Sequence, residues 1–139
     1  MRRFMDANVF LYAVIKPRGN VPEGVLEKKR KAKEILKRVE NGEEIVTSVV
    51  HLSEVANILE AKLGLSVAID FLEELLTAKN VTVLPVSTED YLRSLIVARE
   101  RRISVNDALA YLKMKELGIE EIYTFDKHFL NLDVRVLTE

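Results

Sequence analysis

Apolar residues recur every three or four positions along several stretches of the chain, which is the spacing of one face of an α-helix. The clearest stretch spans residues 23–40, whose apolar stripe consists of Val25, Ala32, Ile35, Leu36 and Val39. Similar spacing, with Ser or Thr before it or Gly after it, predicts helices over 48–63, 66–78, 87–102 and 104–117. The nearly continuous apolar run at 8–15 predicts one further, buried helix.

Short apolar stretches between the helices predict β-strands over 3–6, 44–47, 81–86, 121–124 and 134–137. Because a helix separates each strand from the next, the strands are expected to pair in parallel. We therefore predict an α/β fold, a three-layer α/β/α domain around a central, mainly parallel sheet of five strands. Residues 1–139 are expected to form one domain, since no repeat, low-complexity tract or linker interrupts them.

Composition narrows the class of protein. The chain has 139 residues, 48% of them hydrophobic, which is enough to bury a core. Its 21 Lys and Arg residues nearly balance 22 Asp and Glu residues, which excludes a simple polycation that coats nucleic acid. The absence of Cys excludes disulfides, thiolate metal sites and cysteine nucleophiles. No targeting segment or membrane-length apolar run is visible, so a cytoplasmic protein without a membrane span is expected.

Carboxylates gather where the predicted sheet would bind a ligand, beyond the carboxyl ends of its strands. Asp6 ends the first strand, and Asp126 follows the strand at 121–124. Glu54 lies about two turns into the helix after the second strand, on the same side of the sheet. Asp107 stands at the start of the helix that precedes the fourth strand. We therefore expect all four carboxylates at one edge of the sheet.

Each aspartate also has an alternative role as a helix cap. Asp6 would cap the helix at 8–15, Asp126 would cap a short helix at 127–130, and Asp107 has capping-box spacing from Ser104. Two of the acids also lie on apolar helix faces, where charged side chains are rare without a partner. Glu54 shares its face with Val50 and Ile58, and Asp107 shares a stripe with Ala110, Tyr111, Met114 and Leu117. In the helix at 48–63, the side chains expected to face the core are those of Leu52, Val55, Ala56, Leu59 and Leu63.

Four converging carboxylates without basic neighbours would repel one another, and a divalent cation would relieve that repulsion. Ligands that are all oxygen atoms favour Mg²⁺ or Mn²⁺ over Zn²⁺. Such a metal site can activate a water molecule and polarise a phosphodiester. The pattern of acids therefore favours metal-assisted hydrolysis.

The segments that carry these acids resemble the four signature blocks of PIN-domain proteins, and are most similar to VapC-type toxin endoribonucleases of prokaryotic toxin–antitoxin pairs. The segments are FMDANVFLYAV at 4–14, SVVHLSEVANIL at 48–59, SVNDALAYLKMKELGI at 104–119 and IYTFDKHF at 122–129. The resemblance follows essentially the whole chain in order and spacing.

This resemblance implies a metal-dependent endoribonuclease with a PIN-like fold that hydrolyses RNA phosphodiester bonds with Mg²⁺ or Mn²⁺. Its catalytic and metal-binding residues would be Asp6, Glu54, Asp107 and Asp126. Asn8 and Thr124 match polar positions near such a cluster and are expected to contact substrate, although Thr124 also suits an ordinary strand position. The resemblance further implies a homodimer and a cognate antitoxin protein whose basic segment would cover the acidic site. Some relatives have one more acid at position 129, where this chain has Phe129.

Other functions stay open on the sequence. They are a catalytically silent PIN-like interaction module, a PIN nuclease in housekeeping RNA processing, and a small-molecule phosphatase. The last is weakened because Asp6-Ala7-Asn8 lacks the second Asp of phosphatases that form a phosphoaspartate. His51 and His128 are expected in core or solvated positions rather than in catalysis, although His128 is close enough to Asp126 to lie near substrate.

Basic residues concentrate in residues 16–38, where nine basic and three acidic side chains give a net charge of +6. This segment fits either a solvated helix face or an electrostatic guide for RNA phosphates. Arg99, Arg101 and Arg102 form a second cluster with the same two interpretations. No aromatic residues interleave with these charges, so the sequence predicts no base-stacking site.

Overall fold

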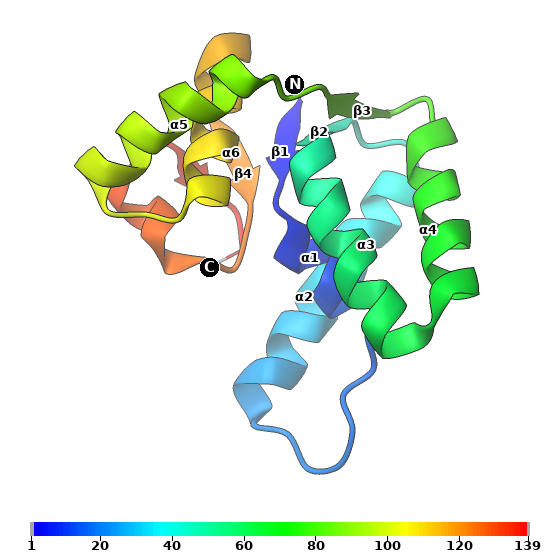
Figure 1. The fold of residues 1–139 in the computed structure, drawn as a ribbon. Coiled ribbons are helices and arrows are strands. Elements are labelled where there is room, and N and C mark those ends of the chain that lie inside the picture. Colours follow the sequence, from blue (N-terminus) through cyan, green and yellow to red (C-terminus); the bar gives the residue numbers. More distant parts are fainter. Residues whose placement is uncertain (1, 139) are drawn as a thin grey trace.

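The computed structural model of the protein describes residues 2–138 (Figure 1). Its strands are β1 (Arg3–Met5), β2 (Ile45–Ser48), β3 (Val81–Leu84), β4 (Glu121–Tyr123) and β5 (Arg135–Val136). Its α-helices are α1 (Ala7–Val14), α2 (Glu23–Glu40), α3 (Val49–Leu63), α4 (Leu65–Thr77), α5 (Thr88–Arg101) and α6 (Val105–Leu117). A short 3₁₀ helix, η1 (Lys127–Asn131), lies between β4 and β5.

The five strands form one parallel sheet in the order β3-β2-β1-β4-β5. The central strand β1 pairs with β2 on one side, where Phe4 lies opposite Val46, and with β4 on the other, where Phe4 lies opposite Ile122. The chain therefore builds outward from β1 in one direction, and then crosses back to add β4 and β5 on the other side. Such a reversal of strand order opens a crevice at the carboxyl ends of the strands, here between β1 and β4.

Alternating side chains of the strands supply two cores, one on each face of the sheet. Met5, Ile45 and Tyr123 pack against helices α1 to α4. Phe4 and Ile122 point to the opposite face, where the core includes residues of α6 and η1. Figure 1 shows α5 and α6 together on one side of the sheet and α1 to α4 on the other. The predicted three-layer α/β/α fold is confirmed.

Local capping signals explain where several helices begin and end. Ser87 and Asp90 form a reciprocal capping box at the start of α5. Ser48 and Ser104 accept hydrogen bonds from the backbone of the first turns of α3 and α6. Gly118 ends α6 in the left-handed conformation, with φ of 66°, which glycine adopts at no steric cost. These ends agree with the predicted helices to within one or two residues.

One expectation about the core is wrong. Leu63 is expected to face inward, but it is 37% exposed, and Leu117, the last residue of the apolar stripe that Asp107 shares, is similarly exposed at 38%. Both stand at the last residue of a helix, directly before the glycine at which the helix ends. The strand predicted at 3–6 also ends one residue early, because Asp6 caps α1. Among residues 2–138, no helix combines the length and the apolar character that crossing a membrane requires.

Candidate active site

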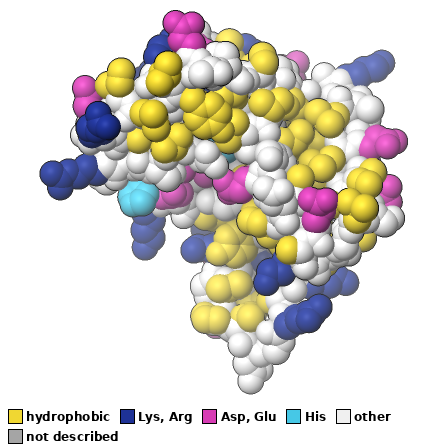
Figure 2. Space-filling model, viewed as in Figure 1, with side chains coloured by type: hydrophobic (Ala, Val, Ile, Leu, Met, Phe, Trp, Pro, Cys, Tyr) yellow, Lys and Arg dark blue, Asp and Glu magenta, His cyan; other side chains and the backbone are white. Residues whose placement is uncertain are grey.

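The crevice between β1 and β4 holds all four carboxylates singled out in the sequence. They line one pocket of about 360 Å³, which we call the acidic pocket. Its lining residues are Asp6, Asn8, Glu54, Ser104, Val105, Asn106, Asp107 and Asp126. Figure 2 shows acidic side chains gathered in the hollow between the α5–α6 side and the α1–α3 side of the molecule. Four elements far apart in sequence thus converge on one site.

Asp6 is buried and held in place at both carboxylate oxygens. As the N-cap of α1, its Oδ1 accepts a hydrogen bond from the Ala7 N–H at 2.8 Å. Its Oδ2 accepts a hydrogen bond from the Thr124 hydroxyl at 2.7 Å. Burial nevertheless raises the pKa of Asp6, against the effect of these two donors. The capping role and a place in the acidic pocket are therefore compatible for this residue.

Thr124 links Asp6 to the loop that carries Asp126. While its hydroxyl donates to Asp6, the same oxygen accepts a hydrogen bond from the Asp126 N–H at 3.0 Å. The side chain of Asn8 accepts a hydrogen bond from the Phe125 N–H at 3.2 Å and fixes the same loop to α1. Thr124 is only 1% exposed. This geometry favours a positioning role for Thr124, and its contact with substrate stays a prediction.

Asp107 is the carboxylate whose hydrogen-bonding capacity is least used. The Ser104 hydroxyl accepts a hydrogen bond from its backbone N–H at 3.1 Å, but the Asp107 side chain does not complete a capping box. Its Oδ2 is buried and has no hydrogen-bond partner among residues 2–138. Burial, together with the nearby carboxylates of Asp126 and Asp6, raises the pKa of Asp107 to about 8. A buried carboxylate oxygen without a partner is costly, and a bound cation would offset that cost.

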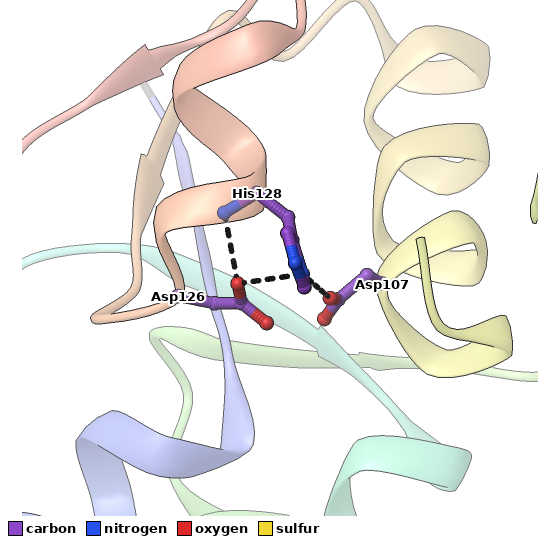
Figure 3. Close-up of side chains that lie close together, drawn as sticks. All are labelled: Asp107, Asp126 and His128. Atoms are coloured by element: carbon purple, nitrogen blue, oxygen red, sulfur yellow. Dashed lines mark hydrogen bonds and ion pairs between the residues drawn. The ribbon is translucent and has the colours of Figure 1, made fainter. Parts of the chain in front are cut away.

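Asp126 faces Asp107 across the pocket, and His128 lies beside both (Figure 3). The Nδ1 atom of His128 is 3.1 Å from Asp126 Oδ1 and 3.7 Å from Asp107 Oδ2. Ligand atoms of the three side chains lie within 4.8 Å of one another. Burial raises the pKa of Asp126, but the Asp107 carboxyl and the His128 N–H outweigh burial and lower it overall. Of the two facing carboxyls, Asp107 therefore retains a proton more readily than Asp126.

Glu54 belongs to a hydrogen-bonded chain that runs behind the pocket. Its Oε1 accepts a hydrogen bond from the Asn106 side-chain amide at 2.8 Å. The Asn106 carbonyl lies 3.1 Å from Nε2 of His51, and Nδ1 of His51 lies 2.6 Å from the Ser48 hydroxyl. Burial lowers the pKa of His51 to about 4, so the ring is neutral near pH 7. A neutral ring with its hydrogen on Nε2 donates to Asn106 and accepts from Ser48, which fits the expected core role of His51.

The comparisons with known proteins agree with this geometry. The family model of the PIN domain matches residues 3–135. The chain belongs to the PIN domain family. A search of curated proteins finds no significant sequence match.

Solved structures share the fold of this PIN domain at low sequence identity. The VapC20 toxin of Mycobacterium tuberculosis, described as cleaving the sarcin–ricin loop, has a TM-score of 0.65 at 22% identity, over 91% of this chain and 92% of that chain. A toxin–antitoxin complex from Klebsiella pneumoniae gives a TM-score of 0.68 at 15% identity, over 99% of this chain and 98% of that chain. VapBC2 of Rickettsia felis, bound to a DNA fragment from its promoter, gives a TM-score of 0.66 at 14% identity, over 99% of this chain and 98% of that chain.

The donor set of this PIN domain fits a divalent cation such as Mg²⁺ or Mn²⁺. It offers carboxylate oxygens from Asp6, Asp107, Asp126 and Glu54, with a histidine nitrogen at the rim. Oxygen ligands suit both metals, and the unpartnered Oδ2 of Asp107 is the atom whose desolvation a cation would offset. The chemistry of the residues thus supports a metal site, although which of them bind the ion stays a prediction.

Two residues at the site did not figure among the predicted site residues. Asn106 holds Glu54 and lines the pocket, and the signal for it was its place beside Asp107 in the first turn of α6. For His128 a core or solvated position close to Asp126 is expected, and its side chain is indeed exposed, with the ring in contact with Asp126. At position 129, where some relatives carry an acid, Phe129 is fully buried in the core beside α6. That side chain therefore contributes nothing to the acidic pocket.

Proposed function

We propose that this PIN domain is a Mg²⁺- or Mn²⁺-dependent endoribonuclease that hydrolyses RNA phosphodiester bonds. The observation that carries the proposal is the acidic pocket itself. Four carboxylates line it, no Lys or Arg among the lining residues neutralises them, and one carboxylate oxygen is buried without a partner. A scaffold that only binds proteins has no need for such a costly arrangement.

In this mechanism Asp6, Glu54, Asp107 and Asp126 would hold the metal, directly or through water. A bound Mg²⁺ or Mn²⁺ supplies an activated water molecule and stabilises negative charge on the scissile phosphate. Thr124 keeps Asp6 and the Asp126 loop in fixed relative positions. Asn106 does the same for Glu54, so the carboxylates are oriented before substrate arrives.

We further propose that the protein is the toxin of a type II toxin–antitoxin pair and acts in the cytoplasm. The similar structures from Klebsiella pneumoniae and Rickettsia felis support a protein partner, since they are a toxin–antitoxin complex and VapBC2. A basic antitoxin segment would find electrostatic complementarity in the acidic pocket.

A homodimer is the second protein contact that we propose. Figure 2 shows apolar side chains gathered over the α5 side of the molecule. Four large apolar residues of α5 are exposed: Tyr91, Leu92, Leu95 and Ile96. Exposed apolar patches of this kind are typical of protein interfaces. Light scattering on the purified protein is expected to give the mass of two chains, and the mass of one chain would contradict the homodimer.

The test of the nuclease is cleavage of a panel of RNAs with Mg²⁺, with Mn²⁺ or with EDTA. We expect cleavage with either metal, none with EDTA, and none by Asp6→Asn. The matched control is Asp70→Asn, which removes one exposed carboxylate from α4 and should leave cleavage intact. Equal cleavage by Asp6→Asn or with EDTA would contradict the mechanism.

The remaining outcomes identify the alternatives. No cleavage of any RNA, together with no measurable metal binding, would favour an interaction module. Hydrolysis of a phosphomonoester but not of RNA would favour a phosphatase. Cleavage of RNA by a protein whose expression does not arrest growth would favour a nuclease of housekeeping RNA processing.

A further inference from the structure

The basic segment of α2 divides into residues whose charged groups are fully engaged within the protein and residues that make only one weak contact each, Lys28 with the Tyr12 ring at 5.7 Å and Lys31 with the Thr138 carbonyl at 3.5 Å. Lys29 donates hydrogen bonds from Nζ to three backbone carbonyl oxygens at the end of α1. Arg30 pairs with two glutamates of its own helix. Lys28 and Lys31 instead border a hollow on the other side of the helix. The charge of this segment therefore has a structural part and a part left free for a ligand.

This hollow, which we call the lysine pocket, has a volume of about 350 Å³. One wall is the first half of α2, with Lys28 and Lys31, and the opposite wall is the segment from β4 into η1, with Lys127. Its volume falls within the range of about 300–1,000 Å³ that is typical of small-ligand sites. The pocket is large enough to take one nucleotide unit rather than only an ion.

The charges around the lysine pocket favour an anion. Among residues 2–138, no carboxylate pairs with Lys28, Lys31 or Lys127. Lys31 donates one long hydrogen bond to the Thr138 carbonyl at 3.5 Å, so each of the three ammonium groups keeps donors for a ligand. Glu27, an acidic residue of the α2 wall, is neutralised by its pair with Arg30. Ammonium groups bind phosphate as strong, charge-assisted donors. A basic peptide, by contrast, would be repelled here.

The floor of the pocket is apolar and includes an aromatic ring. Phe125, Leu130 and Val136 line it below the three ammonium groups. The Phe125 ring is fixed by an edge-to-face contact with Tyr12, with 5.3 Å between the ring centroids. Nucleic-acid bases pack on such aromatic and apolar surfaces in proteins that bind single strands. The fold thus brings together charge and an aromatic surface that lie about a hundred residues apart in the sequence.

The lysine pocket and the acidic pocket meet at one residue. Asp126 lines both, and Thr124, which borders the lysine pocket, holds Asp6 of the acidic pocket. In Figure 2, Lys and Arg side chains lie just below the hollow that holds the acids. A polynucleotide with one phosphate in the acidic pocket can therefore continue past Asp126 into the lysine pocket.

We infer that the lysine pocket is a substrate subsite that holds the nucleotide next to the scissile phosphate of single-stranded RNA. Lys28, Lys31 and Lys127 bind its phosphate, and Phe125 and Leu130 contact its base. This inference rests on the proposed nuclease function, because the scissile phosphate must lie in the acidic pocket. It extends that function by naming the residues that position the substrate.

The test compares two double variants of the same helix. Lys28→Gln/Lys31→Gln removes two charges from the lysine pocket, and Lys33→Gln/Lys37→Gln removes two exposed charges outside it. Binding of a short labelled single-stranded RNA is measured by fluorescence anisotropy in the Asp107→Asn background, where no cleavage interferes.

We expect the first variant to weaken binding about tenfold or more. The slope of log K against log salt should become shallower by about 0.7 for each phosphate that the protein no longer neutralises. The control should change affinity by less than about twofold, as exposed surface charges contribute little.

A third variant, Phe125→Leu, keeps the apolar floor but removes the ring. It is expected to weaken RNA binding at least about fivefold, the lower limit for the loss of one stacked base. Thermal unfolding of each variant checks that the fold is retained. Equal RNA affinity of the two lysine double variants would overturn the subsite, as would a loss confined to binding of an antitoxin. If the wild type binds the RNA through these lysines but cleaves none, the lysine pocket is an RNA-binding site, and both the nuclease proposal and the placement of this site beside a scissile phosphate fail.

Discussion

Asp90 and Asp107 occupy equivalent places in two neighbouring helices, yet their carboxylates have opposite surroundings. Each stands three residues after the serine that caps its helix, Ser87 for α5 and Ser104 for α6. The two are equally buried, at 7% and 6% exposure. Only Asp90 completes its capping box, by accepting a hydrogen bond from the Ser87 N–H at 2.9 Å.

The difference comes from the cations that reach Asp90. Lys113 donates to its Oδ2 at 2.9 Å, and Arg93 donates to its Oδ1 at 2.7 Å. With the Ser87 N–H, these donors hold the pKa of Asp90 well below its usual range. Asp107 meets only other carboxylates and a histidine, and its pKa is raised. A buried carboxylate surrounded by donors belongs to the architecture, whereas one left without them is available to a ligand.

The largest expected difference between the two aspartates is in RNA cleavage. Asp107→Asn should reduce the cleavage rate by more than about 100-fold, since even residues that only orient metal ligands contribute about 10–100-fold. Asp90→Asn should leave the cleavage rate of the folded protein within about threefold of the wild-type rate. Asp90 does not line the acidic pocket, so its loss should affect stability without changing the site. Both rates are measured by gel assay with saturating Mn²⁺ at a temperature where both variants are folded. Similar losses in the two variants would show that the contrast has no functional meaning.

For the free energy of unfolding, we expect the larger loss from the Asp90 substitution rather than from the Asp107 substitution. Asp90→Asn should lower the free energy of unfolding by about 3 kcal/mol, because it leaves the buried ammonium of Lys113 with only the more distant Glu116. Asp107→Asn should raise the stability of the metal-free protein, because an amide is less costly to bury among carboxylates than a further charge. Urea denaturation in the presence of EDTA measures both. Destabilisation by Asp107→Asn of the same size as by Asp90→Asn would contradict the account of its environment.

The pH dependence of the metal-free protein should show both residues at once. The pKa of Asp107 is about 8 in the folded state against 3.8 without burial, so its ionisation costs stability progressively as the pH rises from about 4 to 8. The pKa of Asp90 is lowered by folding, so its contribution is present above about pH 4 and is lost as the pH falls below that. Melting temperatures in EDTA should therefore decline on both sides of a maximum near pH 4. Asp107→Asn should reduce the decline toward higher pH and leave the part that comes from Asp6, whose pKa burial also raises.

Added Mg²⁺ or Mn²⁺ provides the control for that experiment. The metal binds the ionised carboxylates, so it should restore the stability of the wild type on the alkaline side. It should have little effect on Asp107→Asn. A decline toward higher pH that is equally large in Asp107→Asn and in the wild type would assign it to groups other than Asp107.

The sequence was sufficient for most of the fold because the signals were local. The stripe of α2 gave its bounds, and the spacing of Ser87 and Asp90 gave the capping box. It was sufficient, too, to collect the four acids of the pocket, since the ends of parallel strands share one edge of the sheet. The roles of those acids in binding and catalysis stay predictions.

What the sequence could not supply were contacts between distant elements. Asp90 and Asp107 have the same local pattern, and the side chain that separates them, Lys113, reaches Asp90 only because α5 packs on α6. The base-contacting surface was missed for the same reason. Phe125 and Lys28 do not interleave in sequence, but the fold places them in one pocket.

The smallest expected effect concerns the serine N-caps of α5 and α6, and it tests whether each cap positions the aspartate that follows it. Ser87→Ala and Ser104→Ala each remove one cap hydrogen bond, at 3.1 Å in both helices, and should each cost about 1 kcal/mol of stability. Cleavage should fall only in Ser104→Ala, because α6 holds Asp107 at the acidic pocket through that cap, whereas Asp90 does not line this pocket. Stability from urea denaturation and cleavage rate are compared for both variants. Equal cleavage by the two would mean that the position of Asp107 is set by the packing of α6 and not by its cap.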